Sequence, residues 1–108
     1  MNGIKRIKKR FRKEANPVFT MEDAERIAKE LDIDFSKEKF DLLQFEMGLN
    51  VELEHGLHDK NTNVTNNDPI LTGKIALAHL NEFPDYYTRL KKLEDEAKEY
   101  WSKQNNYL

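Results

Sequence analysis

Three histidines and several carboxylates gather in two short stretches of the sequence, and this combination could bind a metal or transfer protons. The stretch ELEHGLHD, at residues 52–59, holds two imidazoles and three carboxylates within eight positions. The stretch ALAHLNEFPDYY, at residues 76–87, holds His79 followed by two more carboxylates. Imidazole and carboxylate groups are common zinc ligands and common acid–base catalysts. These two stretches are therefore the candidate site.

A divalent, zinc-like metal is one ligand that the two stretches could hold. His55 and His58 are three positions apart, so on a helix both could face the same way. A histidine and a glutamate repeat this spacing in the second stretch, and pairs of this kind on facing helices build metal sites in bundles. The order differs from the His-Glu-x-x-His of metalloproteases, so that mechanism does not transfer. The predicted metal ligands are Glu54, His55, His79, Glu82 and Asp85, with His58, Tyr86 and Tyr87 as a supporting cluster.

A purely structural polar cluster is the alternative interpretation of the same residues. His79 lies between Ile75 and Phe83 on its expected helix, so its ring should be at least partly buried. A buried imidazole needs a partner, because an unsatisfied polar group costs roughly 1–3 kcal/mol, and Glu54 or Glu52 could supply it. The chain has no serine nucleophile motif and no glycine-rich phosphate loop. The sequence thus favours a non-enzymatic protein, predicts no catalytic residue and leaves catalysis open.

Composition limits the classes of protein to which the chain could belong. Its 108 residues correspond to one domain, with 38% hydrophobic and 35% charged residues. The absence of cysteine excludes disulfides, zinc fingers and thiol catalysis. No apolar run approaches the roughly 18 residues of a membrane span, and no secretory signal begins the chain. A cytoplasmic protein is the simplest expectation, and nothing in the sequence indicates its oligomeric state.

The charge is divided unevenly between a basic arm, residues 1–17, and an acidic body, residues 18–108. Residues 1–16 hold seven Lys or Arg against one Glu, whereas the remainder holds eleven against nineteen acidic residues. The arm could be a disordered tail or an amphipathic helix on a partner. It could also bind nucleic acid weakly, without sequence preference and in a salt-sensitive manner. The residues expected to contact nucleic acid are Lys5, Arg6, Lys8, Lys9, Arg10, Arg12 and Lys13.

The body is predicted to be all-α, a small irregular bundle of four or five helices. The expected helices lie at residues 19–31, 37–47, 50–58, 70–83 and 85–101. Thr20 and Ser36 are expected N-caps, and the pair Asp68-Pro69 is a strong start signal. Gly48 is expected to end the second helix. The last helix carries an apolar stripe made of Tyr86, Leu90, Leu93, Ala97, Tyr100 and Trp101.

Most of the body resembles a domain family of unknown function that occurs in bacteriophage proteins and related bacterial reading frames. The resemblance rests on the segments DFSKEKFDLLQFEMGLNVELEHG and NVTNNDPILTGKIALAHLNEFPDYYTRL and covers roughly residues 18–97. The matching positions are Glu54, His55, Gly56, His79, Leu80, Glu82, Pro84, Asp85, Tyr86 and Tyr87. The resemblance implies a phage or prophage setting, and hence a cytoplasmic or virion-associated protein. It implies no chemistry.

Three hypotheses for the function follow. The first is a non-enzymatic structural or interaction module, phage-related, with a buried Glu/His cluster and a protein partner. The second is a metal-binding domain that could support hydrolysis. The third is a nucleic-acid accessory protein that works through the basic arm.

Overall fold

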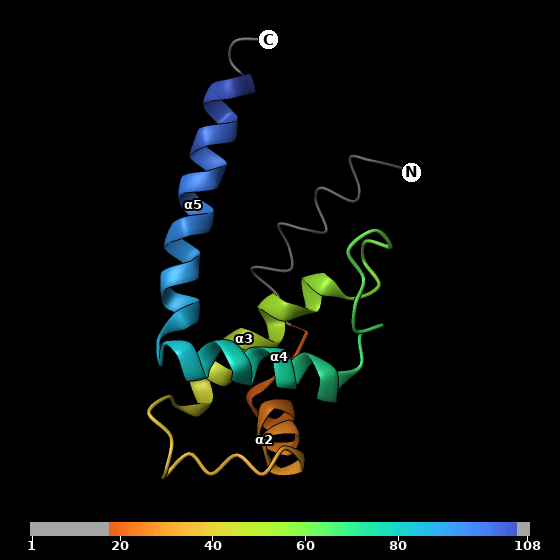
Figure 1. The fold of residues 1–108 in the computed structure, drawn as a ribbon, viewed down its shortest axis with the longest axis vertical. Coiled ribbons are helices and arrows are strands. Elements are labelled where there is room, and N and C mark those ends of the chain that lie inside the picture. Colours follow the sequence, from red (N-terminus) through yellow and green to blue (C-terminus); the bar gives the residue numbers. More distant parts are fainter. Residues whose placement is uncertain (1–17, 106–108) are drawn as a thin grey trace.

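The computed structural model describes residues 18–105 and confirms the predicted all-α bundle. Within this range it contains four α-helices, one 3-10 turn and no strand. These are α2 (Met21–Glu30), α3 (Leu42–Glu52), the 3-10 turn η1 (Leu53–His55), α4 (Pro69–Glu82) and α5 (Tyr86–Asn105) (Figure 1). The basic arm at residues 1–17, with its seven predicted nucleic-acid contacts, lies outside the described residues. None of the helices within residues 18–105 has the length and apolar content that crossing a membrane would require.

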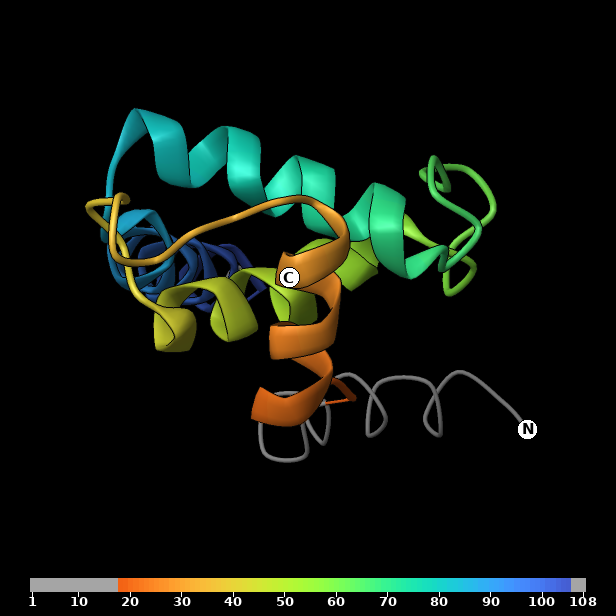
Figure 2. The same cartoon turned by 90° about the horizontal axis from the view of Figure 1, so that it is seen from below.

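Helix α3 lies at the centre of the bundle and contacts each of the other helices. It runs beside α4, and α2 crosses these two helices. Helix α5 projects away from α3 and α4, so it is seen nearly end-on in Figure 2. Phe45 and Leu49 of α3 are completely buried in the core. The other core residues are Ala24, Ile27, Ala28, Phe40, Ala76, Leu80 and Tyr87. Burial of these side chains supplies the main driving force for folding.

The starts of α2 and α4 confirm the predicted caps. The Thr20 hydroxyl accepts a hydrogen bond from the Asp23 amide at 3.1 Å, and the Asp23 carboxylate accepts one from the Thr20 amide at 3.0 Å. This reciprocal capping box satisfies two amides that the helix itself leaves without partners. The bond from the Thr20 backbone is also the main cause of the lowered pKa of Asp23. At α4, Asp68 accepts from two backbone amides and Pro69 occupies the first helical position.

The predicted start and end of the second helix are both wrong. Ser36 lies in a turn, where its hydroxyl donates to the Asp34 carboxylate at 2.7 Å. The helix begins only after Asp41, whose carboxylate accepts from the Gln44 amide at 3.0 Å. Nor does Gly48 end it, since α3 continues to Glu52. The separate helix expected at residues 50–58 is therefore the last turn of α3 followed by η1.

Gly48 allows close approach of three helices rather than a change of direction. A β-carbon at this position would lie 2.6 Å from Cε2 of Tyr87 in α5 and 3.0 Å from Cβ of Ala76 in α4. Real β-carbons do not come as close as 2.6 Å to another heavy atom, so a side chain here would displace the Tyr87 ring. The missing side chain thus determines how closely α5 packs on α3.

A polar loop brings the end of η1 back to the start of α4. The His55 carbonyl accepts from the Val64 amide at 2.6 Å, and the Asn67 side chain accepts from the Leu57 amide at 2.8 Å. Asn66 and Asn67 both have positive φ angles, 54° and 64°. Asparagine tolerates this left-handed region better than other non-glycine residues. The left-handed backbone therefore accounts for Asn66 and Asn67, and the side chain of Asn67 also closes the loop.

Candidate functional site

The centre of the candidate site is Glu52, the last residue of α3, whose side chain is buried. The residue is only 4% exposed, and its Oε2 accepts a hydrogen bond from the Tyr87 hydroxyl at 2.7 Å. Tyr87 lies in the first turn of α5 and is 1% exposed. A buried carboxylate must be hydrogen-bonded to be tolerated in a core. The pair therefore links the end of α3 to the start of α5 inside the protein.

Two half-buried imidazoles flank this carboxylate, one on each oxygen. His55 Nε2, from η1, lies 3.7 Å from Glu52 Oε1. His79 Nε2, from α4, lies 3.8 Å from Glu52 Oε2. Both distances exceed those of hydrogen bonds but allow an ion pair when the ring is protonated. One glutamate thus brings together two histidines that are 24 positions apart in the sequence.

The His79 ring is held by two further side chains. Its Nδ1 lies 3.2 Å from Glu82 Oε1, one helical turn further along α4. The ring stacks on Tyr86, with centroids 4.4 Å apart and an interplanar angle of 16°. Tyr86 in turn packs edge-on against Tyr87 at 5.0 Å. These contacts form a continuous layer across the junction of α4 and α5. We call the six residues of this layer the Glu52 cluster: Glu52, His55, His79, Glu82, Tyr86 and Tyr87.

The remaining predicted site residues lie at the rim or turn away. Glu54 is exposed, and its Oε2 lies 3.9 Å from His55 Nε2. His58 is exposed in the loop that follows η1. Asp85 accepts a hydrogen bond from Arg89 at 2.8 Å, the main cause of its lowered pKa. The sequence prediction placed Glu54 among the ligands and mentioned Glu52 only as an alternative partner, whereas the structure places Glu52 in the middle.

A signal for Glu52 was present in the sequence. Glu52 follows Phe45 by seven positions and Leu49 by three, so all three share a face of one continuous helix. The expected break at Gly48 concealed this, because it assigned Glu52 to a different helix.

Two contacts within the Glu52 cluster occupy atoms that could otherwise bind a metal ion. Tyr87 holds one oxygen of Glu52, and Glu82 lies against one nitrogen of His79. No group of three His, Cys, Asp or Glu side chains within residues 18–105 is arranged to hold a metal ion. Of the predicted metal ligands, His55 and His79 approach the same carboxylate, whereas Asp85 pairs with Arg89.

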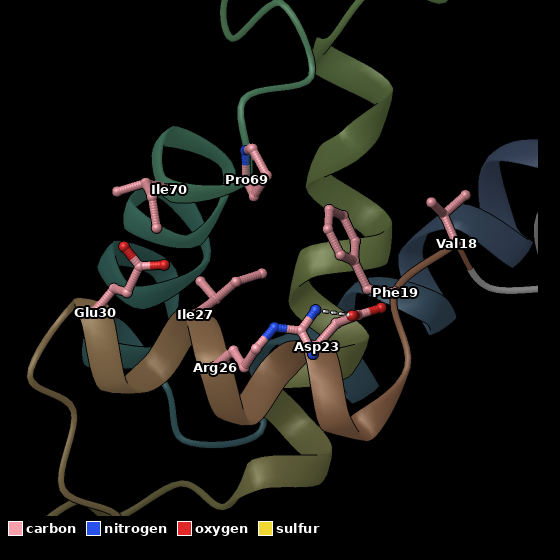
Figure 3. A pocket seen from close by; sticks show the side chains of 8 residues that line it. All are labelled: Val18, Phe19, Asp23, Arg26, Ile27, Glu30, Pro69 and Ile70. Atoms are coloured by element: carbon pink, nitrogen blue, oxygen red, sulfur yellow. Dashed lines mark hydrogen bonds and ion pairs between the residues drawn. The ribbon is translucent and has the colours of Figure 1, made fainter.

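A groove of about 350 Å³ lies elsewhere, between α2 and the first turn of α4 (Figure 3). Phe19, Ile27 and Pro69 give it apolar walls, and an Asp23–Arg26 ion pair lies along α2 at its edge. The lining residues are Val18, Phe19, Asp23, Arg26, Ile27, Glu30, Pro69 and Ile70. None of them belongs to the Glu52 cluster, so this groove does not bring a substrate to the imidazoles.

Alkaline pH is expected to destabilise the protein through Tyr87. Burial raises the pKa of this phenol, and the hydrogen bond to Glu52 and its charge raise the pKa further. Above pH 10, the ordinary pKa of tyrosine, the unfolded state loses the proton while the folded state keeps it. The free energy of unfolding should then fall by about 1.4 kcal/mol per pH unit for this one proton. Urea denaturation between about pH 9 and pH 11 measures the slope.

The control for this prediction is Tyr87→Phe, which removes the titrating group and should remove its share of the slope. Burial and the charges of Glu52 and Glu82 also raise the pKa of Tyr86, so part of the slope should remain in this variant. An identical slope in the two proteins would show that Tyr87 does not keep its proton in the folded state.

The comparisons with known proteins identify one family. The model of a family described as "Protein of unknown function (DUF5661)" matches residues 24–96 of the 108, from α2 to the middle of α5. Neither the curated proteins nor the solved structures gave a match.

Proposed function

The chain belongs to this family of proteins of unknown function, and on that premise we propose that it is a non-enzymatic helical module that presents α5 to a protein partner. The setting proposed is a bacteriophage or a prophage, which the resemblance of the body segments implies. Such a protein would act in the host cytoplasm or in the virion.

The observation that carries the proposal is the apolar face of α5 beyond the bundle. The helix has 20 residues, so it is roughly 30 Å long, and only its first turns lie against α3 and α4 (Figure 1). Further along, Leu93, Tyr100 and Trp101 are 59%, 53% and 61% exposed. Large apolar side chains grouped on one projecting helix are characteristic of a protein interaction surface.

The Glu52 cluster supports the proposal as the joint that holds α5. Its members come from α3, η1, α4 and α5, and their polar groups contact one another. The buried pair Tyr87 and Glu52 fixes the start of α5, so the distal half of the helix projects in a defined direction. A substrate would have to displace these contacts, which favours a structural role for the cluster over a catalytic one.

Site-specific photo-crosslinking tests the proposal. A photoreactive amino acid at Tyr100 should crosslink to protein in cells of the source organism. The same residue at Ser102, two positions away on the other side of the helix, should crosslink much less. Equal labelling at both positions, or none at either, would contradict an interaction through this face.

Metal binding is the second candidate, and the approach of two imidazoles to the same carboxylate favours it. Under the main proposal, a chelator should leave the midpoint of thermal unfolding of untagged protein unchanged, because the buried Glu52 carboxylate accepts its hydrogen bond from Tyr87 and needs no metal ion to be stabilised. One equivalent of copurified zinc and a fall in the midpoint on chelation would support the metal instead, because a ligand that binds only the folded state stabilises it. A His55→Ala variant, whose midpoint should then no longer respond to chelator, provides the control.

The nucleic-acid hypothesis stays a prediction, because its residues lie outside the described part of the chain. A steep fall of DNA affinity with salt, lost when residues 1–16 are deleted, would support it.

A further inference from the structure

The apolar positions of α5 repeat with the spacing of a coiled-coil seam. They alternate by four and three positions, as the a and d positions of heptads do. The seam consists of five apolar residues followed by one polar residue at the next position of the repeat: Tyr86, Leu90, Leu93, Ala97, Tyr100 and Gln104. Its first two residues pack against the core of the bundle, and the remaining four lie beyond it. The exposed part, residues 93–104, therefore has a seam but no partner helix within residues 18–105.

We propose that residues 93–104 pair in antiparallel orientation with the same segment of a second copy of the chain. This inference rests on the proposed function, since it names the partner that α5 receives. Most of the pairing segment lies beyond residue 96, where the family match ends.

Side-chain size favours this arrangement. When the two segments are centred on each other, Ala97 of one copy faces Tyr100 of the other, and the same contact occurs again by symmetry. A small residue opposite a large one lets the two layers interdigitate. Leu93 faces Gln104 of the second copy at each end, so the pairing ends in a layer that is half polar. Trp101 lies at the edge of the seam, where it adds apolar area.

Charge complementarity favours the same orientation and register. The g positions of this segment, which flank the seam, are Glu96 and Lys103. In an antiparallel pair the g positions of the two helices face each other, so Glu96 of each copy meets Lys103 of the other. A longer antiparallel overlap, along the whole helix, would instead place Glu96 against itself and Arg89 against Lys103. Like charges would oppose that register.

The bundle itself excludes the parallel orientation. It covers the same face of α5 at Tyr86 and Leu90, so a parallel partner would bring a second bundle to the space that the first one occupies. In the antiparallel pair the two bundles lie at opposite ends.

The size of the interface predicts weak, reversible dimers. A paired segment of 12 residues is roughly 18 Å long. Each copy contributes only four seam residues, so the interface lies at the small end of specific interfaces, which bury at least roughly 1,000 Å². We therefore expect dimers that dissociate on dilution.

Sedimentation equilibrium of the full chain tests the pairing. The average mass should rise from monomer toward dimer between about 1 µM and 1 mM. Trp101 is the only tryptophan of the chain, so its emission should shift to shorter wavelength over the same range. Tyr100→Glu should abolish both changes, whereas the matched variant Ser102→Glu should keep them. Unchanged helicity by circular dichroism shows that each variant is folded. A monomer at every concentration would overturn the proposal.

Two further variants test the register. Glu96→Lys and Lys103→Glu should each weaken the dimer roughly three- to tenfold, because each turns two attractive pairs into repulsive ones. Combining them restores opposite charges across the interface and should restore the Kd to within about twofold of the original. Failure of the double variant to recover would contradict this register.

Disulfide trapping tests the orientation, because the chain has no cysteine of its own. When Ala97→Cys and Tyr100→Cys chains are mixed and oxidised, the mixed disulfide should form in preference to either homodimer, since the bond needs α-carbons within roughly 4.4–6.8 Å. Homodimers would instead indicate a parallel pair. Crosslinks from Tyr100 to a different protein would overturn the self-pairing while leaving the interaction module in place. Absence of any Tyr100-specific crosslink would overturn the module itself.

Discussion

Replacing Tyr87 by alanine is expected to lower the free energy of unfolding by about 3–5 kcal/mol, the range for a large aromatic side chain removed from a core. The ring is 1% exposed, lies against Gly48 and packs edge-on against Tyr86. Its loss would leave a cavity between α3 and α5 and a buried Glu52 carboxylate without its hydroxyl donor. Urea denaturation at neutral pH measures the change.

The variant Tyr87→Phe separates the hydrogen bond from the packing. It keeps the ring but removes the donor, so we expect a loss of about 1–3 kcal/mol from the unpaired carboxylate. Removing the carboxylate as well, in the double variant with Glu52→Met, should recover part of that loss, because no buried acceptor then lacks a donor. Tyr86→Phe is the matched control and should cost less, since the Tyr86 hydroxyl forms no hydrogen bond with any residue between 18 and 105. A loss below about 1 kcal/mol for Tyr87→Ala would show that the ring is not part of the core.

The second large effect is expected at Gly48. Glycine to alanine inside a helix ordinarily stabilises by about 1 kcal/mol. Here we expect the opposite sign, a loss of about 1–3 kcal/mol from overpacking. The new β-carbon would lie 2.6 Å from the Tyr87 ring, which cannot move without breaking its hydrogen bond to Glu52. Thermal unfolding followed by circular dichroism gives the sign directly.

Gly73→Ala is the matched control for Gly48→Ala. Gly73 also lies inside a helix and is buried, but its nearest neighbours are methyl groups of Ile27 and Leu31, at 2.8 and 2.9 Å. The Leu31 side chain is only partly buried and can rotate away, but Ile27 is 5% exposed and its Cγ2 must shift within the core. Neither shift breaks a hydrogen bond, so we expect a smaller loss than at Gly48. Stabilisation by Gly48→Ala would show that α5 can move away from α3 at little cost.

Local sequence determined that the fold is all-α. It also determined where α2 and α4 begin and that α5 is a helix. The caps at Thr20 and Asp68 act on amides two or three positions away, so they are visible without any tertiary information. The same holds for α5, whose apolar spacing identifies a helix wherever it packs. The sequence likewise located the neighbourhood of the candidate site, because His55 and His79 both carry nearby carboxylates.

Only the tertiary structure decided the course of α3 and the centre of the site. Ser36 and Asp41 are both suitable caps, and packing of Phe40 and Phe45 against Phe35 selected the second. Glycine ends many helices in other proteins. At Gly48, however, the helix continues, and the Tyr87 ring from α5 occupies the space that a side chain would need.

The identity of the central carboxylate was decided in the same way. Glu52 and Glu54 are equally acidic and only two positions apart, so composition and spacing do not distinguish them. Continuing α3 through Gly48 turns Glu52 inward to Tyr87 and leaves Glu54 exposed. The sequence also shows an apolar stripe on α5 without showing where the bundle stops covering it. Which side chains are buried depends on residues far away in the chain, so only the packing of the helices determines it.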